Sequence, residues 1–401
     1  MISRDIYLNK LIKHKDNELI KVITGIRRCG KSTLLKLYEN YLINNKISNK
    51  QIIFINFELM EFDQITNYKL LYSYIKDKIN NNEKYYIFLD EIQKVKNWEK
   101  AVTSLNIDSN VDIYITGSNA YLLSSELSTL LSGRYVEIKM LPLSFKEFLS
   151  SKHLDSKNLS LNNIFQEYLK FGSFPTITNL PQDEEIINDY LNGILDTILI
   201  KDVISRNNIN NINLINNILK YIVSNTGNTF SPKSISNFLN HHNNSSINSN
   251  TISNYVTFLE KAFIIYKAPR YNIKGKEILK TLSKYYVIDI GIRNMILGYS
   301  DSDKGHVLET IVYFELLRRG YQVFVGKYYN NEVDFVAIKK DKIKYYQVTL
   351  TIMDKNVKER ELKPLKAISD NYEKILLSMD KTFITDYNGI IYQNIIDFLL
   401  E

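Results

Sequence analysis

The sequence predicts an α/β protein of several domains, and three observations support this prediction. The chain has 401 residues, more than one hydrophobic core usually organises. Near its amino end, residues 19–24 form an apolar strand that is followed by a glycine-containing loop and a helical pattern, and further apolar strands are expected at 85–89 and 111–116. Near its carboxyl end, residues 304–350 read as helix, strand, strand and strand. Both patterns are typical of sheets covered by helices.

The composition limits the class of protein. Hydrophobic residues make up 44% of the chain and charged residues 24%, as in an ordinary globular protein. The net charge of +7 permits contact with nucleic acid but does not require it. The single cysteine, Cys29, excludes an intrachain disulfide and a zinc site built from cysteines. Because no signal-peptide pattern and no apolar run of membrane-spanning length occur, we expect no membrane association and a cytoplasmic location.

The segment after the first strand has the pattern of a phosphate-binding loop. Residues 25–32, GIRRCGKS, fit G-x-x-x-x-G-K-[ST]. The glycines let backbone N–H groups face a phosphate, and the helix that follows adds its positive end. Lys31 is expected to neutralise the β- and γ-phosphate oxygens, and Ser32 to offer its hydroxyl to Mg²⁺; an ordinary glycine-rich turn is the alternative. The predicted nucleotide-binding residues are Gly25, Ile26, Arg27, Arg28, Cys29, Gly30, Lys31, Ser32 and Thr33.

The second apolar strand ends in two acidic residues, Asp90 and Glu91. An Asp at the carboxyl end of such a strand binds Mg²⁺ directly or through water, and the adjacent Glu can orient and deprotonate an attacking water. Helix-capping acids give the same pattern, but the loop upstream favours catalysis. No Asn-Lys-x-Asp motif, which would read guanine, occurs in the chain. The predicted ligands are therefore ATP and Mg²⁺.

Two further side chains are candidates for catalysis, alongside Glu91. Asn119 follows the third apolar strand and could contact the γ-phosphate or the attacking water, with Ser118 as the second choice and a simple turn as the alternative. Arg134 lies in a short loop before another predicted strand, a suitable place for an arginine that reaches a phosphate. A structural salt bridge is an equally good interpretation of Arg134.

The middle of the chain predicts helices and a basic ribbon. Residues 141–206 read as helical and are expected to form a lid over the nucleotide. Three short helices between residues 212 and 265, followed by a ribbon around Gly275, have the outline of a winged helix-turn-helix. The helix that begins near Thr251 carries few basic residues, so a module that only packs domains together is the alternative to DNA contact. The ribbon residues expected to contact DNA phosphates are Arg270, Lys274 and Lys276.

Two predicted strands between residues 331 and 350 carry Asp334, and then Gln347 and Thr349. Metal-dependent nucleases of the restriction-endonuclease type place an Asp on the first strand, and on the second a Glu or Gln, one residue, and a Lys. Glu309 falls on the preceding helix, where such enzymes often place an acid that faces the metal. Thr349 stands in the place of the lysine and cannot steady a hydroxide, so we expect a nuclease-like domain that is inactive.

The expected remnant of the nuclease site consists of Glu309, Asp334 and Gln347. Two alternatives stay open. The domain could be an active nuclease in which Lys355 or Lys358 replaces the missing lysine, or the strands could be unrelated to nucleases.

Several motifs together resemble a known family. They are TGIRRCGKST, FLDEIQ, ITGSNA, LSGRY with PLSFKEF, YLKFGSFP and YYVIDIGIR. The chain resembles, over nearly its whole length, a family of bacterial and archaeal AAA-type ATPases whose carboxyl-terminal domain of unknown function is similar to the restriction-endonuclease-like fold. The resemblance implies an ATPase core at 1–140, a helical lid at 141–206, a winged helix at 207–285 and a nuclease-like domain at 286–401.

The function expected from the sequence is the binding and hydrolysis of ATP, coupled to a conformational change on a partner. DNA is the candidate partner, and another protein or a second copy of the chain are further candidates. One alternative is a nucleotide switch or scaffold that does not hydrolyse ATP. A second alternative is an ATP-gated, metal-dependent nuclease.

Overall fold

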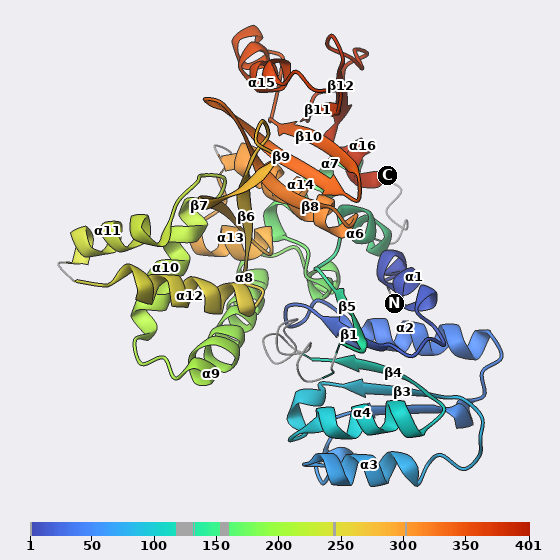
Figure 1. Ribbon diagram of the computed structural model, residues 1–401. Coiled ribbons are helices and arrows are strands. Elements are labelled where there is room, and N and C mark those ends of the chain that lie inside the picture. Colours follow the sequence, from blue (N-terminus) through green and yellow to red (C-terminus); the bar gives the residue numbers. More distant parts are fainter. Residues whose placement is uncertain (1, 118–130, 132, 153–159, 244–245, 301–302) are drawn as a thin grey trace. The chain divides into compact units, whose positions relative to one another are not determined.

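A computed structural model describes the chain except for residues 1, 118–130, 132, 153–159, 244–245 and 301–302 (Figure 1). The chain divides into two compact units, Met1–Pro142 and Leu143–Glu401. None of the described helices is both long enough and apolar enough to cross a membrane.

The first unit contains a five-stranded parallel sheet in the order β2-β3-β4-β1-β5. Its strands are β1 (Ile20–Thr24), β2 (Ile52–Asn56), β3 (Tyr85–Asp90), β4 (Val111–Thr116) and β5 (Tyr135–Lys139). Every residue of β1, β3 and β4 is buried, which is why these strands read as continuous apolar runs rather than as alternating patterns. The predicted α/β class is confirmed.

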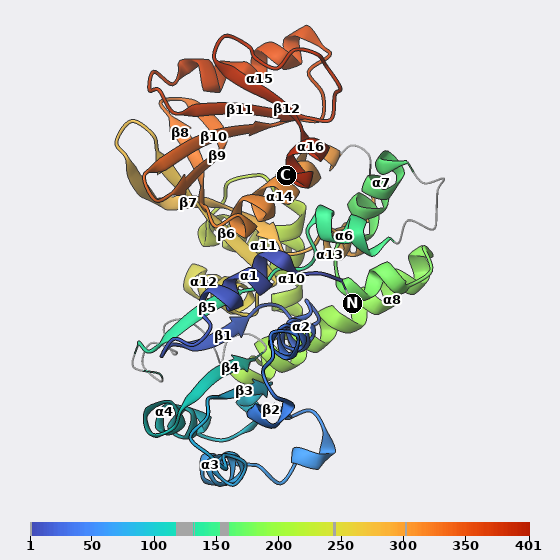
Figure 2. The same ribbon diagram turned by 90° about the vertical axis from the view of Figure 1, so that its right-hand side faces the viewer.

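Helices cover both faces of this sheet (Figure 2). They are α1 (Asp5–Lys13), α2 (Lys31–Asn44), α3 (Tyr68–Lys76) and α4 (Trp98–Asp108), with short turns η1 (Asn49–Gln51), η2 (Met60–Phe62) and η3 (Ile92–Lys94). Alternate residues of a strand face opposite sides. Leu89 of β3 therefore joins the core under α3 and α4, whereas its neighbour Phe88 meets Tyr38 of α2 on the other side.

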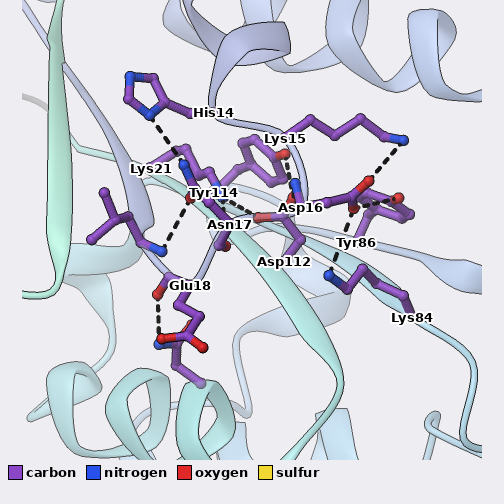
Figure 3. A network of polar contacts seen from close by, with 12 residues as sticks. His14, Lys15, Asp16, Asn17, Glu18, Lys21, Lys84, Tyr86, Asp112 and Tyr114 are labelled. Atoms are coloured by element: carbon purple, nitrogen blue, oxygen red, sulfur yellow. Dashed lines mark hydrogen bonds and ion pairs between the residues drawn. The ribbon is translucent and has the colours of Figure 1, made fainter.

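The sheet also carries a buried polar network near the amino ends of its strands (Figure 3). Lys21 of β1 forms an ion pair with Asp112 of β4, and both side chains are fully buried. Asp112 also accepts hydrogen bonds from the Tyr114 hydroxyl at 2.7 Å and from the Asp16 N–H at 2.8 Å. These bonds offset the cost of taking the two charges out of water. They explain why a lysine interrupts the apolar run of β1.

The amino-terminal part of the second unit is helical. It comprises α6 (Phe145–Ser151), α7 (Leu161–Phe171), η5 (Pro175–Asn179), α8 (Glu184–Thr197), the π-helical η6 (Ile198–Ile204) and α9 (Ser205–Asn207). These are followed by α10 (Ile212–Ser224), α11 (Pro232–Asn243) and α12 (Ser249–Lys261). The helical pattern expected for residues 141–206 therefore ends close to where α9 ends.

The other part of the second unit is a mixed seven-stranded sheet in the order β12-β11-β10-β9-β8-β6-β7. Its strands are β6 (Ile265–Asn272), β7 (Glu277–Val287), β8 (Gln322–Tyr328), β9 (Asn331–Lys339), β10 (Lys342–Val348), β11 (Glu373–Ser378) and β12 (Ile390–Asn394). The helices of this part are α13 (Ile290–Leu297), α14 (Lys304–Arg318), α15 (Lys355–Ala367) and α16 (Ile395–Leu400).

The ribbon expected after the three helices is the hairpin of β6 and β7. It does not stand alone, because β6 pairs in parallel with β8 through Arg270, Tyr271 and Asn272. The hairpin is therefore one edge of the seven-stranded sheet.

Two motifs that are distant in the sequence meet inside the second unit. The buried carboxylate of Asp289 accepts hydrogen bonds from the Ser173 N–H at 2.6 Å and the Ser173 hydroxyl at 2.8 Å. A Cβ on Gly172 would lie 2.3 Å from Asp289 Oδ1, and a Cβ on Gly291 would lie 2.2 Å from the carbonyl oxygen of Phe171. Only glycines allow this approach, so the motifs around Phe171 and Asp289 form one packing unit.

Candidate functional site

The loop between β1 and α2 turns sharply at its two glycines. Gly25 has φ +147°, and a Cβ there would lie 2.2 Å from the carbonyl oxygen of Met140. Gly30 has φ +102° and immediately precedes α2. Because L side chains rarely adopt these conformations, glycine is required at both positions. The loop therefore leads directly into a helix N-terminus, the arrangement that suits a bound phosphate.

Lys31, the first residue of α2, is held against this loop. Its side chain is buried, and its Nζ donates to the carbonyl oxygens of Gly25 at 3.1 Å and Ile26 at 3.2 Å. A phosphate oxygen carries a full charge and would be a stronger acceptor than either carbonyl. The Cys29 thiol is buried, and burial raises its pKa.

The acidic pair lies at the carboxyl edge of the sheet, where β1, β3 and β4 end together. The Thr116 hydroxyl at the end of β4 donates to Asp90 Oδ1 at the end of β3, at 2.5 Å, and accepts from the Glu91 N–H at 3.0 Å. The Ser32 hydroxyl lies close to the same carboxylate. Burial raises the pKa of Asp90, while these two hydroxyls act in the opposite direction.

Glu91 has a strained backbone. Its φ and ψ are 58° and 45°, a left-handed conformation that costs a non-glycine residue about 1–3 kcal/mol. Its carboxylate accepts from Gln93 Nε2 at 2.5 Å. Such strain persists only where the surroundings impose it, and it is often found at functional sites. Here the Thr116 hydroxyl holds the strained N–H.

The residues around Asp90 fit a magnesium ion. Asp90 Oδ2 is buried and has no hydrogen-bond partner within the described part of the chain. The Ser32 hydroxyl lies on the same carboxylate. Carboxylate and hydroxyl oxygens are the hard ligands that Mg²⁺ prefers, and Mg²⁺ usually keeps several waters and binds substrate phosphates as well.

Two family models and a relative match this chain. Residues 17–149 match the family model described as an AAA domain, and residues 162–303 match a domain of unknown function (DUF8612). An uncharacterized protein of Haemophilus influenzae is 42% identical over 402 residues, which cover 100% of this chain and 99% of that protein. The chain belongs to the AAA-type P-loop ATPase family.

Other relatives of this AAA-type protein extend the comparison. An uncharacterized protein of Methanocaldococcus jannaschii is 38% identical over 384 residues, covering 92% of this chain and 82% of that protein. The Walker-type ATPase of Pyrococcus abyssi has a similar fold, with a TM-score of 0.54 and 16% identity, over 74% of this chain and 96% of that chain. The resemblance to AAA-type ATPases with a domain of unknown function is confirmed.

Of the remaining catalytic candidates of the AAA-type protein, the structure describes only Arg134. Asn119 and Ser118 are outside the described residues. Arg134 is exposed, and its carbonyl oxygen accepts from the N–H of Ile20, the first residue of β1, at 3.0 Å. The phosphate loop leaves the other end of β1, about 15 Å away at ~3.3 Å per residue. Arg134 therefore lies at the amino end of β1, whereas the phosphate loop of the same chain lies at its carboxyl end.

Sequence reasoning did not single out two residues that hold the site of the AAA-type protein in place. Thr116 fixes both acidic residues, and the only signal for it was a polar residue at the end of a buried strand. Arg4 is buried, and its guanidinium donates to the carbonyl oxygens of Cys29 at 3.0 Å and Leu141 at 2.6 Å. No local pattern around Arg4 indicates this contact with the phosphate loop.

The three residues of the expected nuclease remnant come together in the second unit of the AAA-type protein. The Asp334 N–H donates to Gln347 Oε1 at 3.4 Å, and Glu309 and Asp334 both lie near Lys284 Nζ, at 2.9 and 3.7 Å. The Thr349 hydroxyl instead donates to the carbonyl oxygen of Thr351 at 3.3 Å. Within the described residues, no three His, Cys, Asp or Glu side chains form a group that could hold a metal.

Proposed function

We propose that this AAA-type protein binds Mg-ATP in the loop of residues 25–33 and hydrolyses it to ADP and phosphate. The observation that supports hydrolysis is the arrangement at the carboxyl edge of the sheet. There Thr116 fixes Asp90 and the strained Glu91 beside Ser32. Hydrolysis needs a general base beside the metal ligand, and Glu91 supplies a carboxylate at that position.

Each residue of the site has a defined task in this proposal. The loop N–H groups and Lys31 bind the β- and γ-phosphates. Ser32 and Asp90 hold Mg²⁺, which when bound neutralises charge on the phosphates. Glu91 orients the attacking water and accepts its proton. Thr116 keeps both acids in position.

Arg134 fits this proposal only in an assembly of several copies. Because it lies at the edge of the sheet away from its own phosphate loop, it would serve a nucleotide bound by a neighbouring copy. An arginine supplied to another subunit in this way accelerates hydrolysis by orders of magnitude. Mixing Arg134→Ala with Lys31→Ala protein tests this arrangement: activity that exceeds that of either variant alone is expected, and no gain would remove Arg134 from the catalytic residues.

The proposed partner is DNA. Lys274 and Lys276 are exposed at the tip of the β6–β7 hairpin, where Lys274 Nζ donates to the Tyr329 hydroxyl at 2.7 Å. Exposed lysines of this kind suit phosphate contacts. Arg270 is half-buried where β6 pairs with β8, so it contributes less than the two lysines.

The proposed activity is tested by measuring steady-state phosphate release from ATP, alone and with single-stranded, duplex and branched DNA. Release that exceeds the Lys31→Ala background and rises with one DNA structure would support an ATPase coupled to DNA. Tight ATP binding with release no greater than the Lys31→Ala background would overturn hydrolysis and favour the nucleotide switch.

A further inference from the structure

A buried lysine lies among three carboxylates in the second unit. Lys284 is on β7 and its side chain is 3% exposed. Its Nζ lies 2.9 Å from Glu309 Oε1, 3.0 Å from Glu332 Oε1 and 3.7 Å from Asp334 Oδ1. These acids come from α14 and β9, so the lysine joins three different elements.

Each oxygen of the two most buried carboxylates of this group faces a polar group of the protein. Glu309 Oε1 accepts from the Tyr286 hydroxyl at 2.6 Å as well as from Lys284, and Glu309 Oε2 lies 3.8 Å from His306 Nδ1. Asp334 Oδ2 accepts from the Val348 N–H at 2.9 Å, while Oδ1 faces Lys284.

Gln347 contacts the group only through its Oε1, which accepts from the Asp334 N–H at 3.4 Å. Its Nε2 donates to Glu361 Oε2 on α15 at 2.9 Å, and Glu361 Oε1 accepts from Arg360 at 2.7 Å. The amide nitrogen therefore satisfies Glu361 and not a carboxylate of this group.

The charges of the group favour an ammonium over a metal ion. An isolated ammonium at this depth would be unfavourable. The three carboxylate oxygens that lie 2.9, 3.0 and 3.7 Å from Lys284 Nζ supply the opposite charge that a buried ammonium needs. A divalent cation would have to approach the same oxygens within about 2.0–2.6 Å, in contact with this like charge.

We propose that Lys284 is the resident cation of the carboxylate cluster formed by Glu309, Glu332 and Asp334, and that it takes the place a divalent metal would occupy. The wild-type domain then holds no metal at this position and does not cut nucleic acid. Lys284 instead ties β7 of the hairpin to α14 and β9.

The proposal is tested by Mn²⁺ titration of the nucleotide-free, full-length protein, followed by the electron paramagnetic resonance of free Mn²⁺. Lys284→Ala removes the ammonium and leaves the carboxylates, so it should gain one Mn²⁺ site at least ~10-fold tighter than any site of the wild type. Adding Asp334→Asn should abolish the gain. Lys344→Ala removes a lysine that pairs with the half-exposed Glu373 on the same sheet and should behave like wild type.

A second measurement applies if Lys284→Ala does not fold. Wild type and the single variant Asp334→Asn are then compared, and their Mn²⁺ binding should be the same. Weaker binding by Asp334→Asn would overturn the proposal, as would a Lys284→Ala protein that folds but gains no site. DNA cleavage by the wild type in Mn²⁺ that is lost in Lys284→Ala would also overturn it, because Lys284 would then be a catalytic lysine beside a metal.

Discussion

Thr116 at the end of β4 donates a hydrogen bond to Asp90 at the end of β3. The same oxygen accepts from the Glu91 N–H, so a single hydroxyl fixes the proposed magnesium ligand and the proposed base. Because β4 lies between β3 and β1 in the sheet, this contact ties the acids to the strand beside the one that leads into the phosphate loop.

Replacing Thr116 with Val should therefore impair catalysis more than binding. The shape is kept, but Asp90 loses a hydrogen bond to its charged group, worth about 1.5–3 kcal/mol. We expect the kcat for ATP hydrolysis to fall about 10- to 100-fold, measured by phosphate release, with a smaller change in ATP affinity. Thr116→Ser keeps the hydroxyl and should retain most activity. Equal activity of the Val and Ser variants would show that the Thr116 hydroxyl is dispensable for hydrolysis.

Glu91→Gln should separate binding from chemistry. The amide keeps the shape of the side chain but cannot accept a proton, so hydrolysis should slow by about two to four orders of magnitude, while calorimetry shows ATP affinity close to wild type. A parallel loss of ATP affinity would instead assign Glu91 to metal binding or to the structure of the loop.

Lys31→Ala should remove most of the nucleotide affinity. In the structure Lys31 Nζ donates to the backbone carbonyl oxygens of Gly25 and Ile26, and a phosphate oxygen would replace them. Calorimetry should show at least ~10-fold weaker ATP binding. Lys36→Ala on the exposed face of the same helix is the matched control. If Lys31→Ala binds ATP as well as Lys36→Ala does, the loop is not the nucleotide site.

Reversing both charges at the hairpin tip should weaken DNA binding. The double variant Lys274→Glu, Lys276→Glu removes two candidate phosphate contacts, so its affinity for DNA should fall. The slope of log affinity against log salt concentration should also become shallower, by the amount expected for about two phosphate contacts. Anisotropy titrations at several salt concentrations measure both effects. Lys46→Glu with Lys50→Glu makes the same charge change at exposed positions of the first unit. Identical curves for the two double variants would mean that the hairpin does not contact DNA.

The parts of the molecule that the sequence predicted are local. The phosphate loop is eight consecutive residues, and the acidic pair follows an apolar strand directly, so spacing alone indicated both. Buried parallel strands give continuous apolar runs, and these led to the α/β class that the structure confirms.

The parts that the sequence did not predict depend on contacts between distant residues. Lys284 lies 25 residues before Glu309, and Arg4 lies 25 residues before Cys29, with no pattern linking either pair. The pairing of β6 with β8 was equally hidden, because periodicity predicts that a strand exists but not which strand lies beside it. For the same reason the sequence offered Lys355 and Lys358 as candidates for the missing lysine, whereas the lysine that lies near Asp334 is Lys284 of β7.

The pairing of β6 with β8 also limits how the second unit can be divided. A cut at residue 286 would separate β6 from β8 and leave the backbone of β8 without its neighbour. The cut would also break the hydrogen bond between Ser173 and Asp289, because these two residues lie on opposite sides of it. A newly exposed strand edge invites association with other chains, so a fragment of residues 286–401 would tend to aggregate. We expect the hairpin and the rest of the sheet to fold and unfold together as one cooperative unit.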